Sequence, residues 1–97
     1  MKLKQQVREK RDAIAEIADK HGAFNVRIFG SVARGEETEN SDIDFLIDYD
    51  LSKTSPWFPM GLIEDLENLL NCKVDVVTAK SLHYFIRDKI LSEAIKL

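Results

Sequence analysis

The chain has 97 residues, 44% of them hydrophobic and 32% charged, which is typical of one compact domain over 1–97. Its net charge of −3, from 14 Lys and Arg against 17 Asp and Glu, argues against direct binding of DNA or RNA. Cys72 is the only cysteine, which excludes an internal disulfide and fits a reducing compartment. No apolar stretch approaches the length of a signal core or a membrane span, so we expect a cytoplasmic protein without membrane contact.

The first predicted element is an amphipathic helix from Leu3 to Lys20, with Gly22 as its stop. Its apolar residues recur at helical spacing: Leu3, Val7, Ile14, Ile17 and Ala18. The basic side chains on its other face are interpreted as ordinary solvated charge. We expect nothing catalytic in this helix.

A strand at Phe24–Phe29 follows and ends at Gly30-Ser31, which begins a short helix. Gly35 can close that helix in the left-handed conformation. A polar loop over Glu36–Ser41 then leads into a second strand at Asp42–Asp48.

The second half predicts an irregular connection, a helix, a strand and a last helix. Two prolines interrupt 49–60, and Lys73–Thr78 is a valine-rich strand before a helix at Phe85–Ile95. The helix before that strand has its apolar residues on one face: Leu62, Ile63, Leu66, Leu69 and Leu70. We expect an α/β or α+β fold with a small three-stranded mixed sheet and helices mainly on one face.

Two carboxylates stand out on the second strand. Alternation puts Ile43, Phe45 and Ile47 on one face and Asp42, Asp44, Leu46 and Asp48 on the other. Asp42 and Asp44 are about 6.6 Å apart along a strand, so both can reach one divalent cation, whereas Asp48 lies about 13 Å beyond Asp44. Alternatively, Asp42 caps a turn with Ser41 and Asp44 is simply exposed to solvent. The pair alone leaves both interpretations open.

Gly30-Ser31 lies at a strand-to-helix junction, eleven residues before Asp42. Free helix amides, a glycine that allows close approach and the Ser31 hydroxyl suit a phosphate group, although Gly-Ser also makes ordinary turns. Other phosphate and metal motifs fail on particular positions. Glu36 and Glu37 stand where a P-loop needs Lys and Ser/Thr, the second glycine of a dinucleotide fingerprint is missing, and Leu46 and Ile47 interrupt a calcium loop.

The motifs GSVARG at 30–35 and SDIDFLID at 41–48 resemble the signature of the nucleotidyltransferase superfamily that includes DNA polymerase beta. Length and element order look most like the minimal nucleotidyltransferases, which are often antitoxin partners of HEPN-domain toxins. The resemblance implies that Gly30 and Ser31 hold the triphosphate of ATP and that Asp42 and Asp44 bind Mg²⁺, with two ions expected. It also implies a third carboxylate on a later strand. Asp75 is the candidate, because its strand is expected to pair beside Asp42–Asp48; an isolated exposed aspartate is the alternative.

Arg34 matches the arginine of the family pattern, and it could touch phosphate as part of the nucleotide site or brace the acidic loop through a carboxylate. The resemblance further implies transfer of AMP from ATP to a tyrosine hydroxyl of a partner HEPN toxin, with Asp75 helping to deprotonate that hydroxyl. Alternatives are a non-catalytic nucleotide-binding antitoxin that blocks the toxin by contact, and a structural domain without ligand. Trp57 and Phe58 are candidates for exposed aromatics near the site, with core packing as the alternative.

Overall fold

The computed structural model describes residues 3–36 and 42–97, so the predicted loop at 37–41 lies outside the described residues. Two short 3₁₀ turns, Leu51–Lys53 and Ala79–Ser81, accompany the regular elements. In chain order the regular elements are α1 Leu3–Glu9, α2 Arg11–Lys20, β1 Ala23–Phe29, α3 Gly30–Arg34, β2 Ile43–Tyr49, α4 Met60–Leu70, β3 Val74–Thr78, α5 Tyr84–Glu93 and β4 Ile95–Lys96.

The sheet is mixed, as predicted, but it has four strands where three were expected, in the order β3-β2-β1-β4. Strand β1 runs antiparallel to β2 and β4, and β2 runs parallel to β3. The prediction missed β4 because Ile95 continues the helical spacing of α5. In the structure α5 ends at Glu93, the backbone of Ala94 is extended, and Ile95 then pairs with Ile28. A strand of two residues carries no alternation that a sequence pattern could show.

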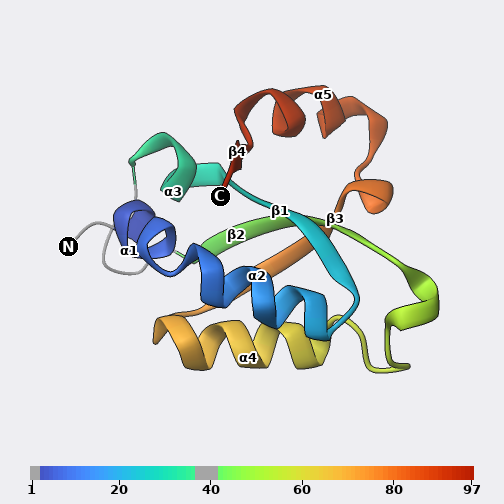
Figure 1. Cartoon of the computed structure of the whole chain (residues 1–97). Helices are drawn as coiled ribbons and strands as arrows, with labels where there is room; N and C mark the ends of the chain where they lie inside the picture. The colour runs from blue at the N-terminus through green and yellow to red at the C-terminus, as the bar shows by residue number, and fades with distance from the viewer. Residues whose placement is uncertain (1–2, 37–41) are drawn as a thin grey trace.

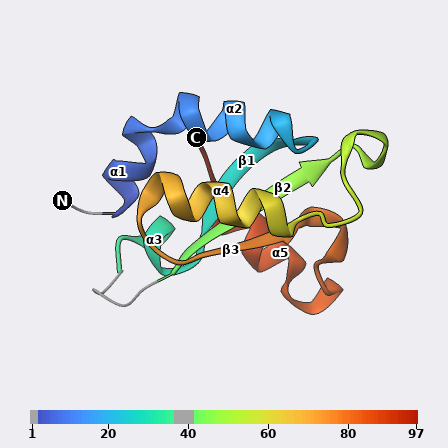
Figure 2. The ribbon, with the colours of Figure 1, turned by 90° about the horizontal axis from the view of Figure 1, so that it is seen from below.

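Helices α2 and α4 cover one face of the sheet, and α5 lies over the opposite face (Figure 1). Seen from below, α4 lies in front of β2 and β3 (Figure 2). The predicted apolar face of α4 is confirmed, because Leu62, Leu66 and Leu70 are buried. Helix α5 buries none of its residues fully, so the helices do pack mainly on one face. No described helix is long and apolar enough to cross a bilayer.

The predicted first helix is two helices that meet at Lys10, whose backbone (φ −102°, ψ 15°) leaves the helical region. The break lets α1 pack against α3 while α2 packs against α4 and β1. Lysines fix both contacts: Lys4 Nζ donates to the Ala33 carbonyl at 3.2 Å, and Lys10 Nζ donates to the Leu69 carbonyl at 3.1 Å. Tertiary packing therefore overrides a helical pattern that is continuous in the sequence.

Strand β2 is the centre of the core. Ile43, Phe45 and Ile47 are buried on the face predicted for them. Leu46, which alternation places on the acidic face, is fully buried as well. The middle of that face is therefore covered, and Leu46 separates Asp42 and Asp44 at the start of the strand from Asp48 near its end.

Candidate functional site

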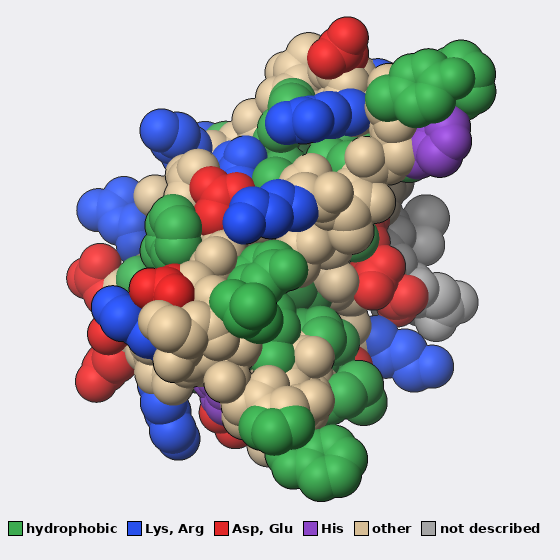
Figure 3. All heavy atoms as spheres, turned by 90° about the vertical axis from the view of Figure 1, so that its right-hand side faces the viewer, with side chains coloured by type: hydrophobic (Ala, Val, Ile, Leu, Met, Phe, Trp, Pro, Cys, Tyr) green, Lys and Arg blue, Asp and Glu red, His purple; other side chains and the backbone are tan. Residues whose placement is uncertain are grey.

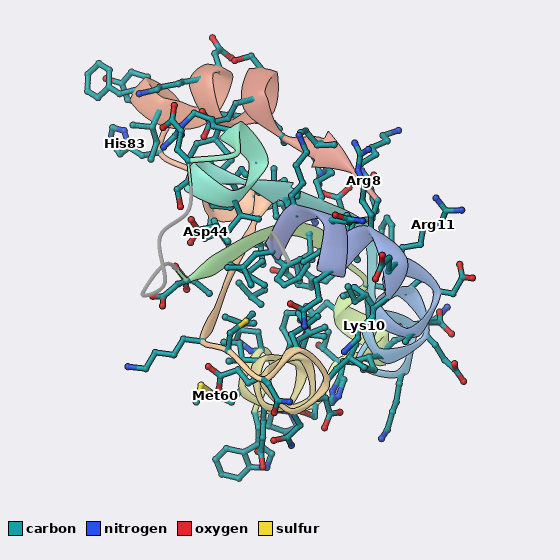
Figure 4. The ribbon with its side chains drawn as sticks, turned by 90° about the vertical axis from the view of Figure 1, so that its left-hand side faces the viewer. Arg8, Lys10, Arg11, Asp44, Met60 and His83 are labelled. Carbon is teal, nitrogen blue, oxygen red and sulfur yellow. The ribbon has the colours of Figure 1, made fainter. Side chains whose placement is uncertain are left out.

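The candidate site lies where β1 turns into α3 beside the starts of β2 and β3. Across the sheet, Phe29 pairs with Asp44 and Asp44 pairs with Asp75. Gly30 directly follows Phe29 as the first residue of α3. The turn and two of the predicted carboxylates thus lie in one row across three strands, and Asp44 lies below α3 in Figure 4. The prediction that the strand of Asp75 pairs beside that of Asp44 is confirmed.

Gly30 is in contact with the carboxylate of Asp44. Its φ of +74° is in the left-handed region, and a Cβ atom built on it would overlap Asp44 Oδ2. Both the backbone conformation and the close approach require glycine here. The predicted left-handed end of the short helix is also confirmed, because Gly35 has φ +73°.

Asp44 is electrostatically unfavourable as a bare carboxylate. Partial burial raises its pKa most, and the neighbouring carboxylates of Asp75 and then Asp42 raise it further. The positive charge of Arg34 opposes this shift, and Glu93 adds to it. Converging like charges of this kind are relieved by a cation, and oxygen ligands are those that Mg²⁺ takes.

Asp42 and Asp75 are exposed, and Ser31 is half-buried. Within residues 3–36 and 42–97, no three His, Cys, Asp or Glu side chains already form a group able to hold a metal ion. The alternative in which Asp42 caps a turn with Ser41 cannot be placed, since Ser41 lies outside the described residues.

Arg34 braces the turn through two carboxylates. Its Nε atom donates to Glu36 Oε2 at 3.0 Å, and its Nη1 atom donates to Glu93 at 3.1 Å (Oε2) and 3.3 Å (Oε1). These bonds raise the pKa of the Arg34 guanidinium, with the Glu36 bond contributing most. They agree with the bracing role considered for Arg34, because Glu36 begins the acidic loop. Glu93 was not predicted, since nothing in its local sequence links it to a turn 63 residues earlier.

Asp48 lies outside the site, as its distance along the strand predicted. It accepts a hydrogen bond from Asn25 Nδ2 at 2.9 Å and forms an ion pair with Arg27 at 3.3 Å. These contacts stabilise the irregular start of β1, where Asn25 has φ 51° and the register with β2 shifts.

Of the two candidate aromatics, Trp57 is exposed, whereas Phe58 follows the alternative and packs against the core. The Phe58 ring packs against Tyr49, with 5.3 Å between ring centroids. Tyr49 ends β2 and Asp44 stands near its start, so about 16 Å of strand separates them. Trp57 is 77% exposed in the same connection.

A family model described as "Nucleotidyltransferase domain" matches residues 2–97. The chain belongs to this nucleotidyltransferase family. "Protein adenylyltransferase MntA" of Thermococcus cleftensis is 36% identical, covering 82% of this chain and 80% of the relative. "Putative protein adenylyltransferase MJ0435" of Methanocaldococcus jannaschii is 40% identical, covering 92% and 95%.

Solved structures agree with the family. A "Structure of putative minimal nucleotidyltransferase" is 39% identical with a TM-score of 0.85, covering 100% of this chain and 97% of the other. A "Crystal structure of the toxin-antitoxin with AMP-PNP" is 20% identical with a TM-score of 0.72, covering 88% and 69%. At that identity the second likeness shows the fold alone. The family predicted from the two motifs is confirmed, and in this nucleotidyltransferase the Gly30 turn of the first motif lies beside Asp44 of the second.

Proposed function

We propose that this nucleotidyltransferase transfers AMP from ATP to a protein hydroxyl, and that the acceptor is a tyrosine of a HEPN-domain toxin. The observation that carries the proposal is the row in which Asp44 pairs with Asp75 and touches the Gly30 turn. A phosphate-binding turn beside converging carboxylates suits phosphoryl chemistry. Two relatives at 36% and 40% identity bear the name protein adenylyltransferase, which supports the acceptor class.

Asp42, Asp44 and Asp75 are the residues that would hold Mg²⁺, with two ions expected. When bound, the metal neutralises phosphate charge and polarises the phosphoryl oxygens. Mg²⁺ is usually bound by one or two carboxylates together with substrate phosphates and waters, not by a complete protein cage. The described residues contain no preformed group of three metal-binding side chains, which is compatible with a Mg²⁺ ion that takes its other ligands from ATP and water.

The chain's own contribution is to position the reactants. The Gly30-Ser31 turn and the Ser31 hydroxyl hold the triphosphate, and Arg34 lies next to them. Asp75 accepts the proton of the acceptor hydroxyl, whose oxygen forms a bond to the α-phosphorus. The bond between the α-phosphorus and the bridging oxygen breaks, and pyrophosphate leaves with that oxygen. Asp75 is exposed beside Asp44, as a base that meets an incoming protein must be.

The acceptor comes from a second protein in this proposal. Large hydrophobic side chains are exposed at the start of α5, where Tyr84 is 71% and Phe85 76% accessible. Figure 3 shows hydrophobic side chains gathered on the face that holds the start of α5 and the β2–α4 connection. Exposed apolar surface of this kind is typical of contact with another protein. The HEPN class of that partner follows from the resemblance to the minimal nucleotidyltransferases.

The proposal is tested with ATP labelled at the α-phosphate, Mg²⁺ and a HEPN-domain protein encoded beside this chain. Label on the HEPN protein is expected with the unaltered chain and not with the double variant Asp42→Asn, Asp44→Asn. Inhibition of the toxin without labelling would support the non-catalytic antitoxin instead. Calorimetry with MgATP alone identifies the third case, because a structural domain without ligand gives no binding heat.

A further inference from the structure

Glu93, the last residue of α5, connects the C-terminal segment to the Gly30 turn. Its side chain is only 20% exposed. Glu93 Oε1 accepts a hydrogen bond from the Gly30 backbone N–H at 3.1 Å. The same carboxylate accepts from Arg34 Nη1 at 3.1 Å and 3.3 Å through its two oxygens. One carboxylate thus binds both ends of α3.

The sheet register explains why Glu93 reaches this position. Strand β4 pairs antiparallel with β1, with Ile28 opposite Ile95 and Arg27 opposite Lys96. Continuing that register two residues past Ile28 brings Gly30 opposite Glu93. The Gly30 amide therefore points toward the β4 side, where it meets the Glu93 carboxylate. The two-residue strand that the sequence did not predict is what sets this contact.

The contacts fix the two groups that the nucleotide site depends on. The Gly30 amide donates its hydrogen bond to Glu93, so this amide holds the turn in place. Among the described residues, no side-chain hydrogen bond occupies the Ser31 hydroxyl. Arg34 is held where its positive charge acts on Asp44 and opposes the rise in the pKa of that carboxyl group. Charge-assisted hydrogen bonds to a largely buried carboxylate are among the stronger polar contacts in proteins.

We propose that Glu93 is a positioning residue that holds the Gly30-Ser31 turn and Arg34 in the geometry that binds the triphosphate. The inference rests on the proposed ATP site and adds a residue of the C-terminal segment to it. Glu93 acts through the turn and Arg34, and it does not touch the nucleotide.

The direction in which MgATP affinity changes when Glu93 is replaced distinguishes a positioning role from a purely electrostatic one. Removing a negative charge next to a triphosphate would, by electrostatics alone, strengthen MgATP binding. Loss of positioning weakens it. The comparison with AMP adds a second readout, because AMP lacks the β- and γ-phosphates and a general loss of folding would weaken both ligands alike.

The experiment measures MgATP and AMP binding by calorimetry, at a temperature below the melting point of each variant. Glu93→Ala is expected to raise the Kd for MgATP about tenfold, the size expected for a lost charge-assisted hydrogen bond, and to leave AMP binding within about twofold. Glu93→Gln, which keeps one acceptor for the Gly30 amide but loses the Arg34 pair, is expected to fall in between, at roughly threefold. Asp88→Asn removes one charge from an exposed position of α5 and serves as the control, with no change expected.

Tighter or unchanged MgATP binding in the Glu93 variants would overturn the proposal, as would equal losses for MgATP and AMP. If Glu93→Ala does not fold, the proposal is tested with Glu93→Gln alone. A MgATP Kd for Glu93→Gln equal to that of the unaltered chain would then overturn the proposal. Absence of MgATP binding by the unaltered chain would instead refute the proposed ATP site itself.

Discussion

The Asp44 carboxylate lies against the Cα atom of Gly30, so close that a methyl group on Gly30 would overlap its Oδ2 atom. Position 30 therefore links the turn to the acidic strand directly. The glycine of the Gly-Ser pair is needed for its left-handed backbone and equally to leave room for a carboxylate of the candidate site.

Replacing Gly30 by alanine is expected to abolish MgATP binding and to lower the free energy of unfolding by about 1–3 kcal/mol, the range for a strained backbone position. Gly35→Ala is the matched control, because Gly35 has nearly the same φ, +73°, while a methyl group on Gly35 would meet nothing within 4 Å among the residues that the structure describes. It should lose stability through strain alone and keep MgATP binding in calorimetry. Equal loss of binding in both variants would contradict the specific role of the Gly30–Asp44 contact.

Asp44→Asn is expected to raise the melting temperature at pH 7 although it removes a proposed catalytic group. The folded-state pKa of Asp44 is raised, so its ionised form costs stability as the pH rises through that pKa. The gain should vanish below about pH 4, where the carboxyl group is protonated in the unfolded chain as well. Thermal melts across pH test this, with Asp88→Asn as a control; a lower melting temperature for Asp44→Asn at pH 7 would contradict it.

Mg²⁺ is expected to raise the melting temperature of the unaltered chain, because a cation relieves the repulsion around Asp44. Chelation with EDTA should reverse the increase. The double variant Asp44→Asn, Asp75→Asn should not respond to Mg²⁺, since it lacks both members of the strand pair. A response of equal size in this variant would place the binding of the metal elsewhere.

Asp65→Asn is expected to lower the melting temperature near neutral pH. His21 Nε2 lies 2.7 Å from Asp65 Oδ2, joining the end of α2 to α4, and this hydrogen bond lowers the pKa of Asp65. A lowered carboxyl pKa gives stability that is present above the unfolded value, about 3.9, and is lost as the pH falls through the folded value. The two melting curves should therefore begin to converge as the pH falls below about 4, and should meet once the pH is below the lowered folded-state pKa of Asp65. Glu64→Gln, an exposed neighbour on the same helix, is the control.

Much of the fold was predictable because its long elements have clear periods. The buried face of α4 and the left-handed Gly35 followed from local patterns, whereas the pairing of β2 with the strand of Asp75 followed from the family resemblance. The break at Lys10 did not, since it comes from α1 packing on α3 instead of from any helix-stopping residue.

The site residues named from the sequence lie in the two motifs, except for Asp75, which the family resemblance indicated. Glu93 reaches Gly30 through a two-residue strand, too short to leave an alternating pattern, and from 63 positions away. The place of Phe58 depends in the same way on the fold, because the length of β2 separates its contact with Tyr49 from Asp44.

The most direct test of the central claim is the intact mass of the proposed HEPN-domain partner after incubation with this chain, ATP and Mg²⁺. We predict a gain of one or more AMP units, mapped to a tyrosine, with the unaltered chain and none with Asp42→Asn, Asp44→Asn. An unchanged partner mass with the unaltered chain, while the toxin is nonetheless inhibited, would contradict AMP transfer.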